Sequence, residues 1–209
     1  MGDSYTIGTS VAEDVRWPNQ LVVALSDSDR PLELVANLGV NGFTSADLIA
    51  VELPRLIELA PEFATVLIGV NDVVQAFAEE RYRSNIEAIF DALLARLAAD
   101  RLLVVTTPDY TVTPAGADYG DPATQSAAIR RFNAIETEAA SDRGIALVNI
   151  FDISERAATD RSLVASDGLH PSGAQYALWA ERIAAAAGRL LAGATPRPSG
   201  PDDVNAFDV

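Results

Sequence analysis

Short apolar runs that alternate with helical patterns constrain the fold of this chain more than any other feature. The runs are of strand length, are rich in Val, Leu and Ile, and cover residues 32–38, 63–70, 102–107 and 145–150. Each is apolar at consecutive positions, which is typical of a parallel strand buried on both faces. The runs therefore predict a parallel sheet in an α/β domain.

The segments between the runs carry the spacing of three and four residues that marks an amphipathic helix. In residues 79–98 the side chains of Tyr82, Ile86 and Phe90 fall on one stripe. A similar stripe runs through residues 171–191, where Pro171 suits the first helical position. Residues 44–59, interrupted by Pro54, and residues 123–140 also read as helices. Strands alternating with helices predict a sheet covered on both faces.

Length and composition limit the classes of protein to which the chain can belong. Its 209 residues suit one domain, which we expect over residues 1–193, followed by a Pro- and Gly-rich tail over residues 194–209. A net charge of −15 argues against nucleic acid and against attachment to an anionic membrane. No apolar run approaches the roughly 18 residues of a membrane span, so no integral membrane association is expected. Without cysteine or a secretory signal, the sequence predicts a cytoplasmic protein.

The chain has one histidine, His170, and it stands in the turn-like stretch Asp167-Gly168-Leu169-His170-Pro171. Three residues of compact backbone can bring Asp167 to one ring nitrogen, which fixes the tautomer and leaves the other nitrogen as a base. A predicted helix begins directly after His170. The N-terminus of a helix is the positive end of its dipole, so it disfavours a charged imidazolium and favours the neutral imidazole. This arrangement predicts a general base.

A base of this kind needs a hydroxyl to activate, and Ser4 in Gly2-Asp3-Ser4 is the natural partner. Acyl chemistry also needs donors for an oxyanion. Gly42 and Asn71 follow predicted strands, and the carboxyl ends of parallel strands line one crevice. The Gly42 N–H, the Asn71 amide and the Ser4 N–H therefore form a predicted oxyanion hole.

Together these motifs resemble one family. The blocks GDSYTIG, NGFTS, GVND and DGLHP, in this order, are similar to the GDSL esterase/lipase family of the SGNH hydrolase superfamily. The resemblance covers residues 2 to about 190 and implies a three-layer α/β/α sandwich with a flavodoxin-like parallel sheet. It also implies that Ser4, Asp167 and His170 form a catalytic triad, with Gly42 and Asn71 in the oxyanion hole. No metal or organic cofactor is expected.

The residues expected to border the crevice are mostly apolar, and Phe43 stands where many relatives carry a polar residue. They are Ile7, Phe43, Val73, Val74, Phe77, Tyr110, Val112 and Leu169. Such walls favour small-molecule esters, and the resemblance suggests short- to medium-chain acyl esters, lysophospholipids or thioesters. Three alternatives stay open. They are a carbohydrate O-deacetylase that uses Tyr110 and Tyr119, a non-catalytic binding module, and a metallophosphatase built on Asp3, Asp72, Asp167 and His170.

The resemblance also predicts a gap in the sheet. Relatives have a hydrophobic strand directly before the GDS block, whereas only Met1 stands there in this sequence. We therefore expect the first strand either to be missing upstream of the nucleophile or to be replaced by another segment. The apolar end of the tail, residues 204–209, is the candidate for such a replacement.

Overall fold

The computed structural model describes residues 1–193. The expected tail over residues 194–209, and with it the replacement strand over residues 204–209, lies outside the described residues. The strands are β1 (Ala64–Val66), β2 (Leu102–Val105) and β3 (Ala146–Val148). The α-helices are α1 (Ser4–Ile7), α2 (Trp17–Ala24), α3 (Ser45–Asp47), α4 (Leu56–Leu59), α5 (Val70–Val74), α6 (Glu79–Leu94), α7 (Pro122–Asp142), α8 (Phe151–Glu155) and α9 (Gly173–Gly193).

The three strands form a parallel sheet in the order β1-β2-β3. Leu103 at the centre of β2 pairs with Thr65 on one side and with Ala146 on the other. Every side chain of β2 is buried, which explains why its sequence is apolar without alternation. The predicted strands at residues 63–70, 102–107 and 145–150 are confirmed, although each regular ladder is shorter than the apolar run.

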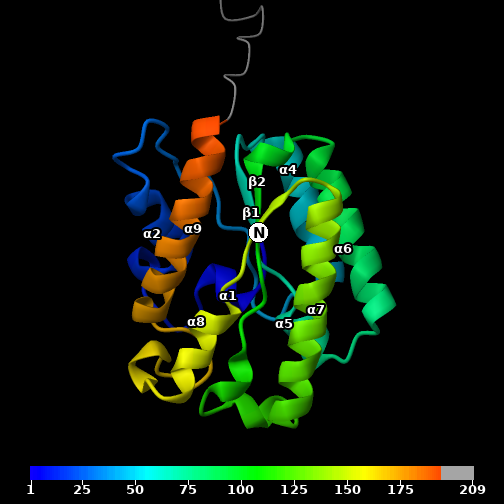
Figure 1. Cartoon of the computed structure of the whole chain (residues 1–209), viewed down its shortest axis with the longest axis vertical. Helices are drawn as coiled ribbons and strands as arrows, with labels where there is room; N and C mark the ends of the chain where they lie inside the picture. Colours follow the sequence, from blue (N-terminus) through cyan, green and yellow to red (C-terminus); the bar gives the residue numbers. More distant parts are fainter. Residues whose placement is uncertain (194–209) are drawn as a thin grey trace, which may run out of the picture.

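Helices cover the sheet on both faces, as the alternation of strands and helices predicted. Figure 1 shows α2 and α9 packed together on one side of the strands, and α6 and α7 on the other. Large aromatic side chains fill both layers. Trp17 and Trp179 are fully buried, and Tyr82 stacks on Phe132 with ring centroids 4.1 Å apart. The molecule is therefore an α/β/α sandwich with one continuous core.

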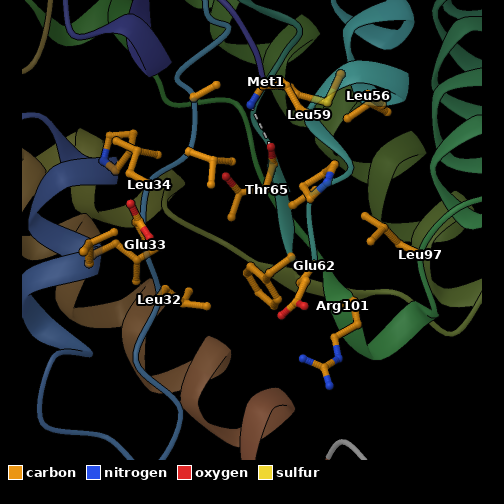
Figure 2. A pocket seen from close by; sticks show the side chains of 18 of the residues that line it. Met1, Leu32, Glu33, Leu34, Leu56, Leu59, Glu62, Thr65, Leu97 and Arg101 are labelled. Carbon is orange, nitrogen blue, oxygen red and sulfur yellow. Dashed lines mark hydrogen bonds between the residues drawn. The ribbon is translucent and has the colours of Figure 1, made fainter. Parts of the chain in front are cut away.

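The predicted strand at residues 32–38 is wrong. This segment forms no regular strand, and Val35 within it is 60% exposed. A cavity of about 1220 Å³ separates it from β1, and within residues 1–193 no strand pairs with it. Figure 2 shows Leu32 and Leu34 on one side of this cavity, with Leu97 on the other and Met1 bonded to Thr65 above. An apolar run becomes a strand only where a partner strand supplies its hydrogen bonds.

The predicted helices differ in regularity. Residues 79–98, 123–140 and 171–191 correspond to the long helices α6, α7 and α9, although Pro171 lies before α9 and pairs with Val164. The prediction for residues 44–59 is confirmed only as a broken helix. There α3 passes into a π-helical turn over Leu48–Glu52 and a 3-10 turn over Leu53–Arg55 before α4. Pro54 lacks an N–H donor, which explains the change of helix type. Helices α1, α2, α5 and α8 were not predicted.

The length and composition of a helix determine whether it can cross a membrane. None of the helices within residues 1–193 is long and apolar enough to cross a bilayer.

Candidate active site

The carboxyl end of the sheet holds Ser4 at the first turn of α1. Gly2 forms a parallel bridge with Leu67 just after β1, and Ser4 follows two residues later. Gly2 has φ of 148°, and a Cβ there would lie 2.1 Å from the Leu67 carbonyl oxygen, so only glycine fits this close approach. Asp3 then caps the helix, since its Oδ1 accepts the Tyr5 N–H at 2.9 Å. The backbone around Ser4 is thus held on both sides.

Asp167 and His170 meet in one turn. Asp167 Oδ2 lies 2.6 Å from His170 Nδ1, while Oδ1 accepts the backbone N–H groups of Leu169 at 2.9 Å and His170 at 3.0 Å. Burial raises the pKa of Asp167, but the hydrogen bonds from Ser10, Leu169 and His170 outweigh it and hold the pKa below its usual range. The carboxylate is therefore ionised at neutral pH and faces the imidazole, as the spacing in the sequence predicted.

The turn with His170 lies against the turn with Ser4. The rings of Tyr5 and His170 have their centroids 5.1 Å apart, and the Ser4 residue is 7% exposed. Among the described residues, the Ser4 hydroxyl and the imidazole form no direct hydrogen bond. Catalytic hydrogen bonds are often long without substrate and shorten when it binds, so this geometry is compatible with a nucleophile and its base.

The loop with Gly42 and the turn with Asn71 are joined to each other. Asn71 Nδ2 donates to the Phe43 carbonyl at 2.8 Å, which uses one of its two amide protons and leaves the second for a ligand. Gly42 has φ of 81°, and a Cβ there would meet nothing within 4 Å, so the loop is open on that side. Its N–H has no backbone acceptor within residues 1–193. Within residues 1–193, the Gly42 N–H and the second proton of the Asn71 amide therefore have no hydrogen-bond acceptor.

Two buried carboxyl groups hold these loops in place through hydrogen bonds. Asp72 Oδ2 accepts the Ser45 N–H at 2.8 Å, which fixes the loop that carries Gly42. Glu52 Oε2 accepts the Gly2 N–H at 2.9 Å, which fixes the approach to Ser4. These two supports were not predicted from the sequence, because each joins residues more than twenty positions apart with no local motif to signal the contact.

We expect the buried carboxyl group of Asp3 to make stability depend on pH. Burial raises its pKa to about 8, the Tyr5 N–H opposes this, and Asp72 and Glu52 raise it further. The folded state thus holds a proton that the unfolded chain releases near the ordinary aspartate pKa of 3.8. The contribution of Asp3 to stability should therefore fall as pH rises from about 4 to about 8, and level off above that range.

Thermal unfolding of Asp3→Asn, followed by circular dichroism between about pH 5 and 8, measures this contribution. The melting temperature of the variant should fall less with pH than that of the wild type. Glu52 has a pKa raised to about 7 by burial and keeps its own slope in both proteins. Asp142→Asn, at the exposed end of α7, is the matched control and should follow the wild type. Parallel curves for wild type and Asp3→Asn would contradict the prediction.

The expected crevice residues fall into two groups. Ile7, Phe43, Val74, Phe77, Val112 and Leu169 are partly exposed. Val73 and Tyr110 are buried, with Tyr110 only 2% exposed and its hydroxyl bonded to Gln125. Their side chains pack in the core, which leaves the first group to contact a ligand. Phe77 is covered on one face by Arg81, whose guanidinium carbon lies 3.7 Å from the ring centroid.

Residues 1–193 contain no group of three or more acidic or histidine side chains placed to bind a metal ion. The four residues of the metallophosphatase alternative, Asp3, Asp72, Asp167 and His170, do not converge. Asp3 and Asp72 are buried under the loops, whereas Asp167 binds the imidazole.

Comparison with known proteins gives one family and a consistent fold. Residues 1–178 match the model of the GDSL-like lipase/acylhydrolase family. The sequence matches none of the curated proteins with which it was compared.

Several solved structures share the fold. A lipase/acylhydrolase from Enterococcus faecalis has a TM-score of 0.72 at 16% identity, over 90% of this chain and 93% of that one. LAE5, an alpha/beta hydrolase enzyme from the metagenome of Lake Arreo, has a TM-score of 0.69 at 22% identity, with the same coverage. An acetyl xylan esterase from Geobacillus stearothermophilus has a TM-score of 0.68 at 17% identity, over 90% and 92%.

Proposed function

Because the chain belongs to the GDSL-like lipase/acylhydrolase family, we propose that it hydrolyses carboxylic esters through an acyl-enzyme on Ser4. The observation that carries the proposal is the pairing of the sole histidine with Asp167 beside the turn of Ser4. Asp167 binds Nδ1 of the imidazole, so the Nε2 lone pair is available to take a proton.

The reaction proceeds in two steps. His170 Nε2 takes the hydroxyl proton as Ser4 Oγ attacks the ester carbonyl, and the tetrahedral intermediate collapses when the imidazolium protonates the leaving alcohol. Water, activated by the same imidazole, then attacks the acyl-enzyme and releases the acid. Asp167 stabilises the imidazolium in both steps and remains ionised.

The negative oxygen of each tetrahedral intermediate lies among the N–H groups of Ser4 and Gly42 and the amide of Asn71. Asn71→Ala is expected to lower kcat about 10²- to 10³-fold, with a much smaller change in KM, because this donor binds the charge that develops in the transition state. Steady-state hydrolysis of p-nitrophenyl butyrate gives both constants.

Asn133→Ala is the matched control, because the Asn133 amide also donates to a backbone carbonyl, that of Thr107, at 2.9 Å. We expect this control to lose stability and to keep kcat within a few-fold of the wild type. An unchanged kcat in Asn71→Ala would show that Asn71 is not part of the oxyanion hole.

The side chains that border the site favour an apolar acyl group. Phe43, Phe77 and Leu169 are partly exposed hydrophobic residues in the segments that carry Gly42, Asn71 and His170. We propose short- to medium-chain acyl esters as the substrate class, with lysophospholipids and thioesters as related forms. Hydrolysis of p-nitrophenyl acetate, butyrate and octanoate tests the class, and kcat/KM should rise from acetate to butyrate. No hydrolysis of any ester by a folded protein would instead favour a binding module.

A second candidate substrate is an acetylated carbohydrate. Tyr119 is 42% exposed, and its ring stands edge-on to that of Tyr110 with the centroids 6.0 Å apart, so it offers one aromatic surface of the kind on which sugars stack. One protein with this fold is an acetyl xylan esterase. Release of acetate from acetylated xylo-oligosaccharides, faster than from p-nitrophenyl acetate and reduced in Tyr119→Ala, would favour this candidate over the acyl esters.

A further inference from the structure

The turn that follows α1 contacts both of the loops that complete the site. Thr9 Oγ1 donates to Asn41 Oδ1 at 2.5 Å, next to Gly42. Ser10 Oγ donates to Asp167 Oδ2 at 2.6 Å, across 157 positions of sequence. The segment that carries Ser4 is therefore linked to both the oxyanion loop and the turn of the base.

The Ser10 hydroxyl completes the set of donors around the Asp167 carboxylate. Oδ1 accepts two backbone N–H groups, and Oδ2 accepts the Ser10 hydroxyl as well as the ring N–H of His170. A carboxylate has about four lone-pair positions, so all of them are used. Rotation of this carboxylate about its Cβ–Cγ bond would break all four contacts at once.

The backbone of Ser10 has a left-handed conformation that is unfavourable for serine. Its φ is 66°, in the left-handed region, where a residue other than glycine is strained. Glycine would adopt this conformation without strain, but it would have no hydroxyl to donate. Strain that is kept at a position whose hydroxyl contacts Asp167 indicates that the hydroxyl has a role.

We propose that Ser10 is a positioning residue of the reaction, which holds the Asp167 carboxylate toward His170 Nδ1 and joins it to the segment of the nucleophile. This inference rests on the proposed triad and adds a fourth residue to it. Ser10 does not touch the reacting atoms, so it acts only through the orientation of Asp167 and the imidazole. Because the site is partly open to water, water replaces part of the lost contact when the hydroxyl is removed. We therefore expect a loss of about tenfold in kcat, smaller than the loss for a triad residue.

Four proteins that differ at position 10 separate the effect of the hydroxyl on activity from the effect of backbone strain. The wild type and Ser10→Thr keep the hydroxyl, whereas Ser10→Ala and Ser10→Gly lack it. Within each pair stability should differ, because Thr tolerates positive φ less well than Ser, and Gly tolerates it better than Ala. Activity should differ only between the pairs. We expect kcat to fall about tenfold in both Ala and Gly variants, with KM within about twofold.

Ala60→Gly is the matched control for strain, because Ala60 also has a positive φ, of 40°, and lines the cavity beside β1, away from the site. We expect this variant to gain stability and to keep the wild-type kcat. Higher activity in Ser10→Gly than in Ser10→Ala would overturn the proposal, since strain and not the hydroxyl would then govern the rate. Equal kcat in all four versions would overturn it as well.

A spectroscopic measurement on the same proteins does not depend on hydrolysis. The chain has one histidine, so the proton on His170 Nδ1, which is hydrogen-bonded to Asp167, should give a single far-downfield NMR signal. Without the Ser10 hydroxyl this signal should shift and exchange faster with water, and in Ser10→Thr it should stay as in the wild type. Failure of the wild type to hydrolyse any ester would contradict the proposed function. An unchanged NMR signal in Ser10→Ala would contradict the proposed role of Ser10.

Discussion

Ser4→Ala is expected to reduce kcat for p-nitrophenyl butyrate by about 10⁴- to 10⁶-fold, because the acyl-enzyme cannot form without the hydroxyl oxygen. The loss should appear in kcat, since the methyl side chain still fits the buried turn. KM should change little. The fold should be unaffected, because the backbone of Ser4, and not its side chain, accepts the N–H groups of Gly8 and Thr9 that close α1.

Ser26→Ala is the control for this variant, since the Ser26 hydroxyl binds the Val23 carbonyl at the exposed end of α2. It should retain full activity. Hydrolysis by Ser4→Ala at the wild-type rate would show that the reaction uses another nucleophile, and the triad proposal would fail.

His170→Ala is expected to cause a loss of similar size, about 10⁴- to 10⁶-fold in kcat. The chain contains no second histidine that could take over as base. Asp167 would keep the hydrogen bonds from Ser10 and from the backbone of Leu169, so the turn should retain its conformation. Hydrolysis of the same ester, with the melting temperature measured in parallel, separates loss of the base from loss of the fold.

Asp167→Asn provides a graded comparison. An amide can offer its N–H₂ to Nδ1 in place of an acceptor, which favours the wrong tautomer of the imidazole and is expected to cost about 10⁴-fold. Addition of free imidazole should partly restore His170→Ala and should leave Asp167→Asn unchanged. An active His170→Ala enzyme would show that the imidazole is not the base.

The central sheet and the long helices could be predicted from the sequence because each depends on a local pattern. The run from Leu102 to Val105 is apolar at every position and forms the central strand β2. The stripe through Tyr82, Ile86 and Phe90 gives α6, with all three side chains fully buried. Periodicity determines such elements before any tertiary contact is considered.

The segment at residues 32–38 shows where local pattern fails. Its composition is that of a strand, but among residues 1–193 no partner strand lies between it and β1. The broken helix at residues 44–59 shows the same limit, since only Pro54 among its residues signals a change of helix type. A strand needs a neighbour, and no single segment specifies one.

The candidate site follows the same division. The pairing of Asp167 with His170 could be predicted, because three residues separate them in one turn. Ser10 contacts the same carboxylate from 157 positions away, and nothing near it in sequence signals that contact. The burial of Tyr110 likewise depends on how the loop folds back onto α7, which the sequence of the loop does not specify.

Labelling with a fluorophosphonate probe, followed by peptide mapping, tests the central claim most directly. The probe reacts with a serine only where an adjacent base activates the hydroxyl. We predict one adduct per chain, on Ser4, that is absent from Ser4→Ala and His170→Ala and that forms more slowly in Asp167→Asn. A folded protein that takes up no probe, or an adduct on any other serine, would contradict the account.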